Sequence, residues 1–183
     1  MKRYLPLVVI PALLLAGCSG TAGTASSDGR IAVVASTDVW GDIVEQVGGD
    51  RVAVTSIIDR PDQDPHEYQA DARDQLAVSR ARLVVVNGGG YDDFLSQLLK
   101  NAPSSTRTLN AADESGLDLT PASGEFNEHI WYDFGAVSKV AGAIAAELGR
   151  MDPTHEAGFT KRLGTFRRAL TALEQQEADI AGA

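Results

Sequence analysis

Two histidines, His66 and His129, lie in sequence settings suited to metal chemistry. His66 is surrounded by acids, because Asp62, Asp64 and Glu67 are close neighbours along the chain. Neutral imidazole is the commonest protein ligand for zinc and also suits other divalent first-row metals. A ligating imidazole usually donates its second ring N–H to a carboxylate or carbonyl group. His66 is therefore a candidate ligand, with Asp64 and Glu67 as candidate groups that orient it.

His129 repeats this pattern further along the chain. Glu128 and Asp133 are its nearby acids, and Trp131 supplies an aromatic ring that would limit access of water. We interpret His155, in contrast, as a solvated residue of the first turn of the last helix. Spacing alone leaves two interpretations of the pair open, because a histidine near an acid is often an ordinary surface residue.

The elements that would position these histidines are strands and helices that alternate along the chain. Apolar runs predict strands at residues 31–35, 52–58, 83–86 and 107–109. Helical spacing predicts helices at residues 39–47, 71–82, 91–101, 133–148 and 154–183. The alternation predicts an α/β fold, with a parallel sheet of about four strands flanked by helices. Ligands of such sheets bind beyond the carboxyl ends of the strands, and His66 follows one of those ends.

Two local features of these elements carry further expectations. Ser36, Thr37 and Asp38 are expected to cap the first helix with their side chains. The segment Gly88–Gly90 follows a strand, as a phosphate-binding loop would, but it lacks the Lys-Ser/Thr pair of a P-loop. A turn that needs permissive backbone is therefore the expected structure.

The start of the chain has the features of an export signal. Residues 1–18 combine a basic start, an apolar run of about 12 residues and a single cysteine, Cys18. The segment Leu15–Cys18 resembles the lipobox of bacterial lipoproteins, in which the cysteine is lipidated. The alternative is an ordinary secretory signal that contains a cysteine. Residues 19–29 are small and polar and are expected to be a flexible tether.

The charge of the chain limits its partners. The full sequence has a net charge of −9, and without Lys2 and Arg3 the excess of acidic residues is larger still. An acidic surface argues against nucleic acid and anionic lipid as partners and agrees with a cationic ligand. Solubility alone would explain the same charge.

The end of the chain is expected to be one long amphipathic helix. Its apolar stripe has no stop signal before the last residues, and a helix of about 25 residues spans roughly 38 Å. We therefore expect that the sequence is truncated within an element that leads elsewhere. The stripe consists of Phe159, Leu163, Phe166, Leu170, Leu173 and Ile180.

Several segments together resemble one protein family. Asp64–Tyr68 is similar to the Asp-Pro-His-x-Tyr/Phe segment of the metal-binding lipoproteins of ATP-binding-cassette importers, the zinc/manganese cluster of solute-binding proteins. Asn127–Asp133 resembles their Asp-Pro-His-x-Trp-x-Asp segment. The stretch Val85–Gly88 and the pair Asp152–Pro153 before a long helix fit as well.

The resemblance implies two α/β lobes joined by a long helix, with the metal between them. Residues 30–152 would be the N-terminal metal-binding lobe, and residues 153–183 the start of the inter-lobe helix. His66 and His129 carry over as two metal ligands, whereas the third and fourth ligands would come from a second lobe. Two departures from the pattern are Glu128 and Phe134, each of which replaces a proline.

The function that the resemblance implies is binding and delivery, not catalysis. The protein would capture Zn²⁺ or Mn²⁺ and deliver it to the membrane permease of an importer, anchored by lipid to the outer face of the cytoplasmic membrane. The choice between zinc and manganese stays open, although residues 113–127 lack the histidines that often accompany zinc import. With two imidazoles, this chain alone is expected to bind metal weakly or not at all.

Three other functions remain as alternatives. The first is a metal-dependent envelope hydrolase, in which Glu67 or Glu128 would act as the base beside a metal held by the two histidines. The second is a truncated product that has no complete metal site. The third is an envelope lipoprotein that serves in adhesion.

Overall fold

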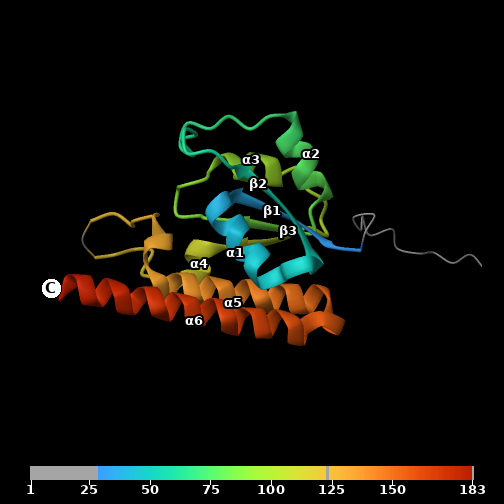
Figure 1. Cartoon of the computed structure of the whole chain (residues 1–183). Coiled ribbons are helices and arrows are strands. Elements are labelled where there is room, and N and C mark those ends of the chain that lie inside the picture. The colour runs from blue at the N-terminus through green and yellow to red at the C-terminus, as the bar shows by residue number, and fades with distance from the viewer. Residues whose placement is uncertain (1–28, 123, 183) are drawn as a thin grey trace, which may run out of the picture.

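Four parallel strands form the centre of the fold, as predicted. They are β1 (Ile31–Thr37), β2 (Val52–Ile58), β3 (Leu83–Val86) and β4 (Arg107–Asn110), in the order β2-β1-β3-β4 (Figure 1). All three pairings are parallel. The computed structural model describes residues 29–122 and 124–182. The predicted signal peptide, Cys18 and all of the predicted tether except Gly29 lie outside the described residues.

Helices cover both faces of this sheet. On one face α1 (Asp38–Gly48), α5 (Phe134–Met151) and α6 (Glu156–Ala181) pack together, while α2 (Ala72–Arg80) and α3 (Phe94–Leu99) cover the other (Figure 1). The side chains of β1 alternate between these layers, so that Val33 joins the first core and Val34 the second. Burial on both faces explains why the strands are continuous apolar runs.

Two local expectations were wrong, and one helix was not predicted. Ser36 and Thr37 do not cap α1, because their hydroxyl groups are buried without a hydrogen-bond partner in the described part of the chain. The helix expected at 91–101 is only α3, since residues 91–93 form turns after the glycines. An additional short helix, α4 (Ala111–Ser115), follows β4, where the Asn110 side chain accepts hydrogen bonds from two backbone N–H groups.

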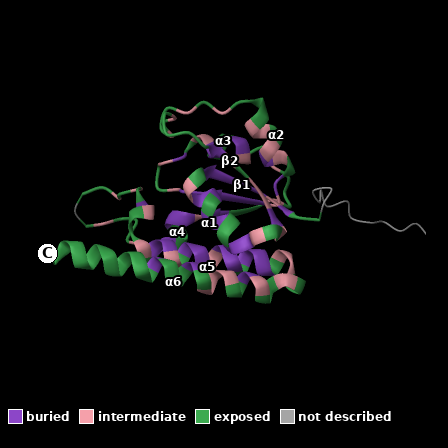
Figure 2. Cartoon of the chain, in the orientation of Figure 1, coloured by how far each residue is buried: buried purple, intermediate pink, exposed green. Residues whose placement is uncertain are grey.

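The long helix α6 packs on the sheet layer along only part of its length. Phe159, Phe166 and Leu170 are buried in the core shared with α1 and α5, and Arg162 donates hydrogen bonds to the last carbonyl groups of α1. Residues 171–182 are all exposed (Figure 2). The apolar stripe of α6 is therefore buried in the first part of the helix and exposed to solvent in the last part. Within the described part of the chain, no helix has the length and apolar character needed to cross a membrane.

Asn87 joins three segments at the carboxyl end of β3. Its side-chain oxygen accepts a hydrogen bond from Trp40 Nε1 at 2.9 Å. Its side-chain nitrogen donates to the backbone oxygens of Gly88 and Glu128, each at 2.9 Å. Asn87 and Trp40 are both fully buried. This network ties α1 and β3 to the loop that precedes α5.

A second polar cluster lies at the opposite end of α5. Asp152 accepts hydrogen bonds from Arg51 Nη2 at 3.1 Å and from His155 Nδ1 at 2.8 Å. The hydrogen bond from His155, together with that from Arg51, holds the pKa of Asp152 below its ordinary value. The cluster fixes the turn between α5 and α6 against the segment between α1 and β2.

We predict that Asn87→Ala lowers the free energy of unfolding by about 1–3 kcal/mol, because it leaves the buried Trp40 N–H and the Glu128 carbonyl without partners. Urea unfolding followed by far-UV circular dichroism measures this change. Asn101→Ala, at an exposed position, is the matched control and should change stability by less than about 0.5 kcal/mol. Equal losses in the two variants would contradict the prediction.

We predict that Asp152→Asn destabilises the protein by about 1.5–3 kcal/mol at pH 7, because it removes charge-assisted hydrogen bonds. Since folding lowers the pKa of Asp152, its contribution is present above the ordinary value of 3.8 and is lost as pH falls through the folded value. Unfolding curves at pH 7, 5 and 3 should show the two proteins converging only at the lowest pH. The exposed Asp50, changed to Asn, serves as control, and a difference that is independent of pH would be the contrary result.

Candidate metal centre

His66 lies in the loop after β2, in a turn shaped by Asp64. The Asp64 carboxylate accepts a hydrogen bond from the His66 backbone N–H at 2.9 Å, and the Asp64 backbone oxygen accepts one from the N–H of Glu67 at 3.2 Å. A side chain that bonds to backbone two residues ahead is an Asx turn, a common local structure of aspartate. Asp64 thus sets the path of the loop and not the imidazole ring directly.

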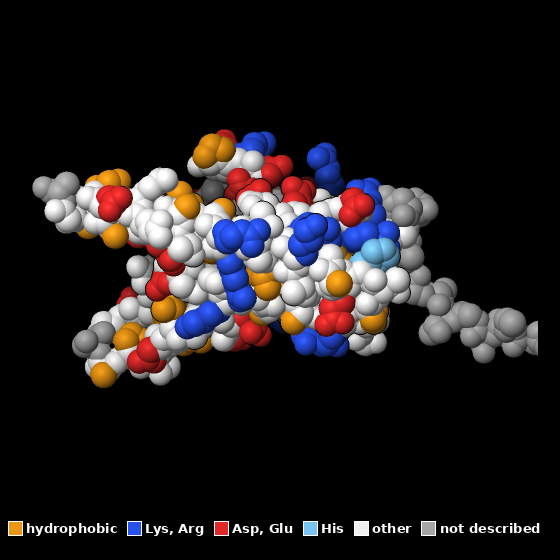
Figure 3. All heavy atoms as spheres, turned by 60° about the horizontal axis from the view of Figure 1, so that its bottom comes forward, with side chains coloured by type: hydrophobic (Ala, Val, Ile, Leu, Met, Phe, Trp, Pro, Cys, Tyr) orange, Lys and Arg blue, Asp and Glu red, His pale blue; other side chains and the backbone are white. Residues whose placement is uncertain are grey.

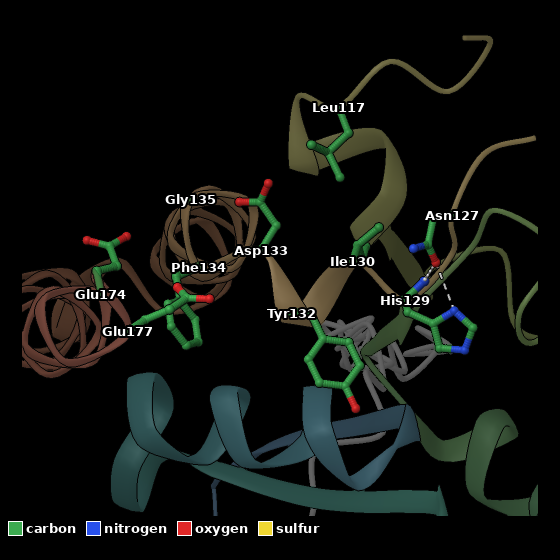
Figure 4. A pocket seen from close by; sticks show the side chains of 10 residues that line it. All are labelled: Leu117, Asn127, His129, Ile130, Tyr132, Asp133, Phe134, Gly135, Glu174 and Glu177. Atoms are coloured by element: carbon green, nitrogen blue, oxygen red, sulfur yellow. Dashed lines mark hydrogen bonds between the residues drawn. The ribbon is translucent and has the colours of Figure 1, made fainter. Parts of the chain in front are cut away.

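His129 is held by its neighbour Asn127. The Asn127 side-chain oxygen accepts a hydrogen bond from the His129 backbone N–H at 3.1 Å and lies 2.9 Å from His129 Nδ1 (Figure 4). Because an amide oxygen only accepts, this contact places a proton on Nδ1 and leaves Nε2 free as a metal donor. The short 3-10 turn Ile130–Tyr132 follows, and the buried Ile130 anchors it in the core.

The structure brings His66 and His129 to the same edge of the sheet. One carboxylate oxygen, Glu128 Oε1, lies 3.6 Å from His66 Nε2 and 3.9 Å from His129 Nδ1. The two side chains keep 48% and 44% of their surface exposed. The pair is therefore open to solvent, and an ion could reach it from outside.

Tyr91, whose role was not predicted from the sequence, contacts both histidines. Its ring centroid lies 5.4 Å from that of His66 and 5.6 Å from that of His129, in edge-on geometry, and 4.9 Å from that of Trp131. Burial, with the carboxylates of Asp64, Asp92 and Glu128 nearby, raises the pKa of Tyr91. Its position directly after the glycine turn at the end of β3 was the signal that could have identified it.

Gly88–Gly90 form the expected turn with permissive backbone. All three residues have positive φ values, between 66° and 96°. A Cβ atom on Gly89 would overlap the Phe126 ring, so glycine also allows the loop before His129 to approach β3. The glycines therefore serve the turn and the packing of Phe126, as expected for a turn that needs permissive backbone.

In the described residues, no ion pair joins the other predicted acids to the imidazole rings. Asp133 accepts a hydrogen bond from the Ala136 backbone N–H at 2.8 Å as the cap of α5, and its carboxylate points away from the His129 ring (Figure 4). Glu67 is exposed. In residues 29–122 and 124–182, no three or more His, Cys, Asp or Glu side chains already form a metal-binding set.

A groove opens beside His129 and separates its loop from the exposed end of α6. The space-filling view shows this hollow between two projecting arms of the molecule (Figure 3). Its volume is about 580 Å³. Acidic side chains contribute to its walls, namely Asp133, Glu174 and Glu177. The side of the site that faces α6 is therefore open and negatively charged.

Curated relatives cover nearly all of this chain. The metal ABC transporter substrate-binding lipoprotein SsaB of Streptococcus sanguinis is 28% identical over 96% of this chain and 60% of its own length. The manganese-binding lipoprotein MntA of Halalkalibacterium halodurans is 29% identical over 92% of this chain and 56% of its own length. The chain thus spans about 60% or less of the length of these relatives.

Solved structures share the fold. The periplasmic zinc binding protein TroA from Treponema pallidum superimposes with a TM-score of 0.73 at 23% identity, over 81% of this chain and 54% of that one. A Mn-bound periplasmic metal binding protein from Candidatus Liberibacter asiaticus gives 0.69 at 21% identity, over 76% and 53%. The family model described as zinc-uptake complex component A, periplasmic, matches residues 33–182. This chain therefore belongs to the family of zinc-uptake complex component A proteins.

Proposed function

We propose that this chain is the N-terminal lobe of a solute-binding lipoprotein that captures a divalent transition metal, zinc or manganese, outside the cytoplasmic membrane. The observation that carries the proposal is the convergence of His66 and His129 on one carboxylate at the edge of the sheet. In sequence the two residues lie in different loops, so the fold itself creates the pair. The names of the relatives, which include manganese-binding and zinc-binding proteins, support this ligand class.

The local chemistry fits capture of a cation. The Asn127 contact leaves His129 Nε2 available. Among residues 29–122 and 124–182, only the Glu128 carboxylate lies within ion-pair distance of His66 Nε2. Negative charge from Asp64 and Glu128 lies around the two rings and attracts a divalent cation. Imidazole nitrogen suits zinc and carboxylate oxygen suits manganese, so two imidazoles with carboxylates beside them leave both ions in the proposal.

Transport, not catalysis, is the role that the family supports. The relatives quoted above are named as metal-binding and transporter proteins, and none of them is named as a hydrolase. We propose that Cys18 carries the lipid anchor and that the partner is the membrane permease of an ATP-binding-cassette importer. In this proposal residues 30–152 form the lobe and residues 153–183 begin the helix toward a second lobe, which would supply the remaining ligands.

Zinc titration followed by nuclear magnetic resonance tests the proposed site. We predict that the ring signals of His66 and His129 shift together along one binding curve, because both rings hold the same ion. The dissociation constant should lie above the micromolar range, since two imidazoles do not complete a four-coordinate site. His155, which is bonded to Asp152 in another part of the molecule, is the internal control.

Two single variants complete this test. His66→Ala should abolish the zinc-dependent shift of His129, and His129→Ala should abolish that of His66. Independent curves for the two rings, or micromolar or tighter binding that does not need both of them, would refute the proposal.

A further inference from the structure

Glu128 occupies an unusual position between the two candidate ligands. In the described part of the chain, it is the one acidic residue whose carboxylate lies within 4 Å of a nitrogen of both His66 and His129. Glu128 is also one of the two departures from the family's motif, which has proline at this position. The residue that distinguishes this chain from the pattern is thus the residue that touches both rings.

The backbone of Glu128 is fixed, and its side chain has room to move. Its backbone oxygen accepts the hydrogen bond from Asn87, which is itself fully buried. The side chain keeps 24% of its surface exposed, and the two imidazoles are its only ion-pair partners in the part of the chain described. No arginine or lysine in that part neutralises this carboxylate at ion-pair distance, so its charge is available to a cation.

The spacing of the donors is close to that of a metal site. Zinc bonds of about 2.0–2.1 Å separate neighbouring ligand atoms on one tetrahedral ion by roughly 3.3 Å. The distance from Glu128 Oε1 to His66 Nε2, 3.6 Å, is only slightly longer. His129 would turn its free Nε2 toward the same point, and its exposed side chain permits that movement. In that turn the His129 ring would leave Asn127, and the three side chains would form a three-donor site only after this rearrangement.

We propose that Glu128 is a third metal ligand contributed by this lobe, so that a divalent cation is held by two imidazoles and one carboxylate. This inference rests on the proposed metal-binding function and extends its ligand set. The carboxylate would neutralise part of the charge of the ion, which two neutral imidazoles cannot do. Glu128 would coordinate the bound ion directly and would not only orient the histidines.

A different role for Glu128 would have the opposite consequence. A carboxylate that only pairs with protonated imidazoles competes with the metal, since a ligating histidine must be deprotonated. Removal of such a competitor would strengthen metal binding. Removal of a ligand weakens it, so the direction of the change separates the two roles.

The test compares Glu128→Gln with Glu67→Gln in zinc titrations of the full chain. Both variants remove one negative charge near His66, but Glu67 forms no ion pair with either ring in the described part of the chain. We expect Glu128→Gln to weaken zinc binding at least tenfold and Glu67→Gln to change it less than about threefold. In the unsubstituted chain, the carboxyl ¹³C signal of Glu128 should shift along the same curve as the histidine rings.

Unchanged or tighter binding in Glu128→Gln would overturn this inference, as would equal losses in the two glutamine variants. His66→Ala and His129→Ala, measured in parallel, separate this outcome from failure of the proposed function. If the alanine variants lose zinc binding and Glu128→Gln does not, the two imidazoles form the site without Glu128. If the alanine variants bind as tightly as the unsubstituted chain, the proposed site itself is wrong.

Discussion

The hydrogen bonds of Asn87 are the constraint on which the site depends. One buried amide accepts from the Trp40 indole and donates to the Glu128 carbonyl, so it connects a helix, the end of a strand and a distant loop. An amide can do this because it carries an acceptor and two donors. Together with the buried Ile130, this connection fixes the loop that carries His129 relative to the sheet edge that carries His66.

The fold around Asn87 positions the two imidazoles without enclosing them. The rings of Tyr91 and Trp131 pack beside the imidazoles, while the other side of the site is open to solvent and to an acidic groove. A site built this way admits an ion readily and holds it with few bonds. In the proposed function, such a lobe would share its metal with another part of a binding protein.

Periodicity and strand composition were sufficient to predict the sheet, because its strands are buried on both faces and read as apolar runs. The β2 and β3 bounds agree with the predicted ranges, and the parallel pairing follows from the alternation with helices. Short elements were missed, since α4 depends on one capping asparagine that leaves no periodic signal. The two histidines were singled out from their residue types and neighbours, and their metal-binding role stays a prediction. Tyr91 and the bridging position of Glu128 depend on loop geometry that no local pattern encodes. The side chains of Ser36 and Thr37 do not cap α1 for a related reason, because their burial in the tertiary structure overrides their local preference.

Anomalous diffraction at the zinc absorption edge, from crystals of this chain grown with zinc, tests whether His66 and His129 bind one ion. We predict one anomalous peak at the carboxyl edge of the sheet, within bonding distance of both His66 and His129. Separate peaks at the two histidines, or one peak elsewhere on the molecule, would show that the rings do not share an ion and would contradict the account.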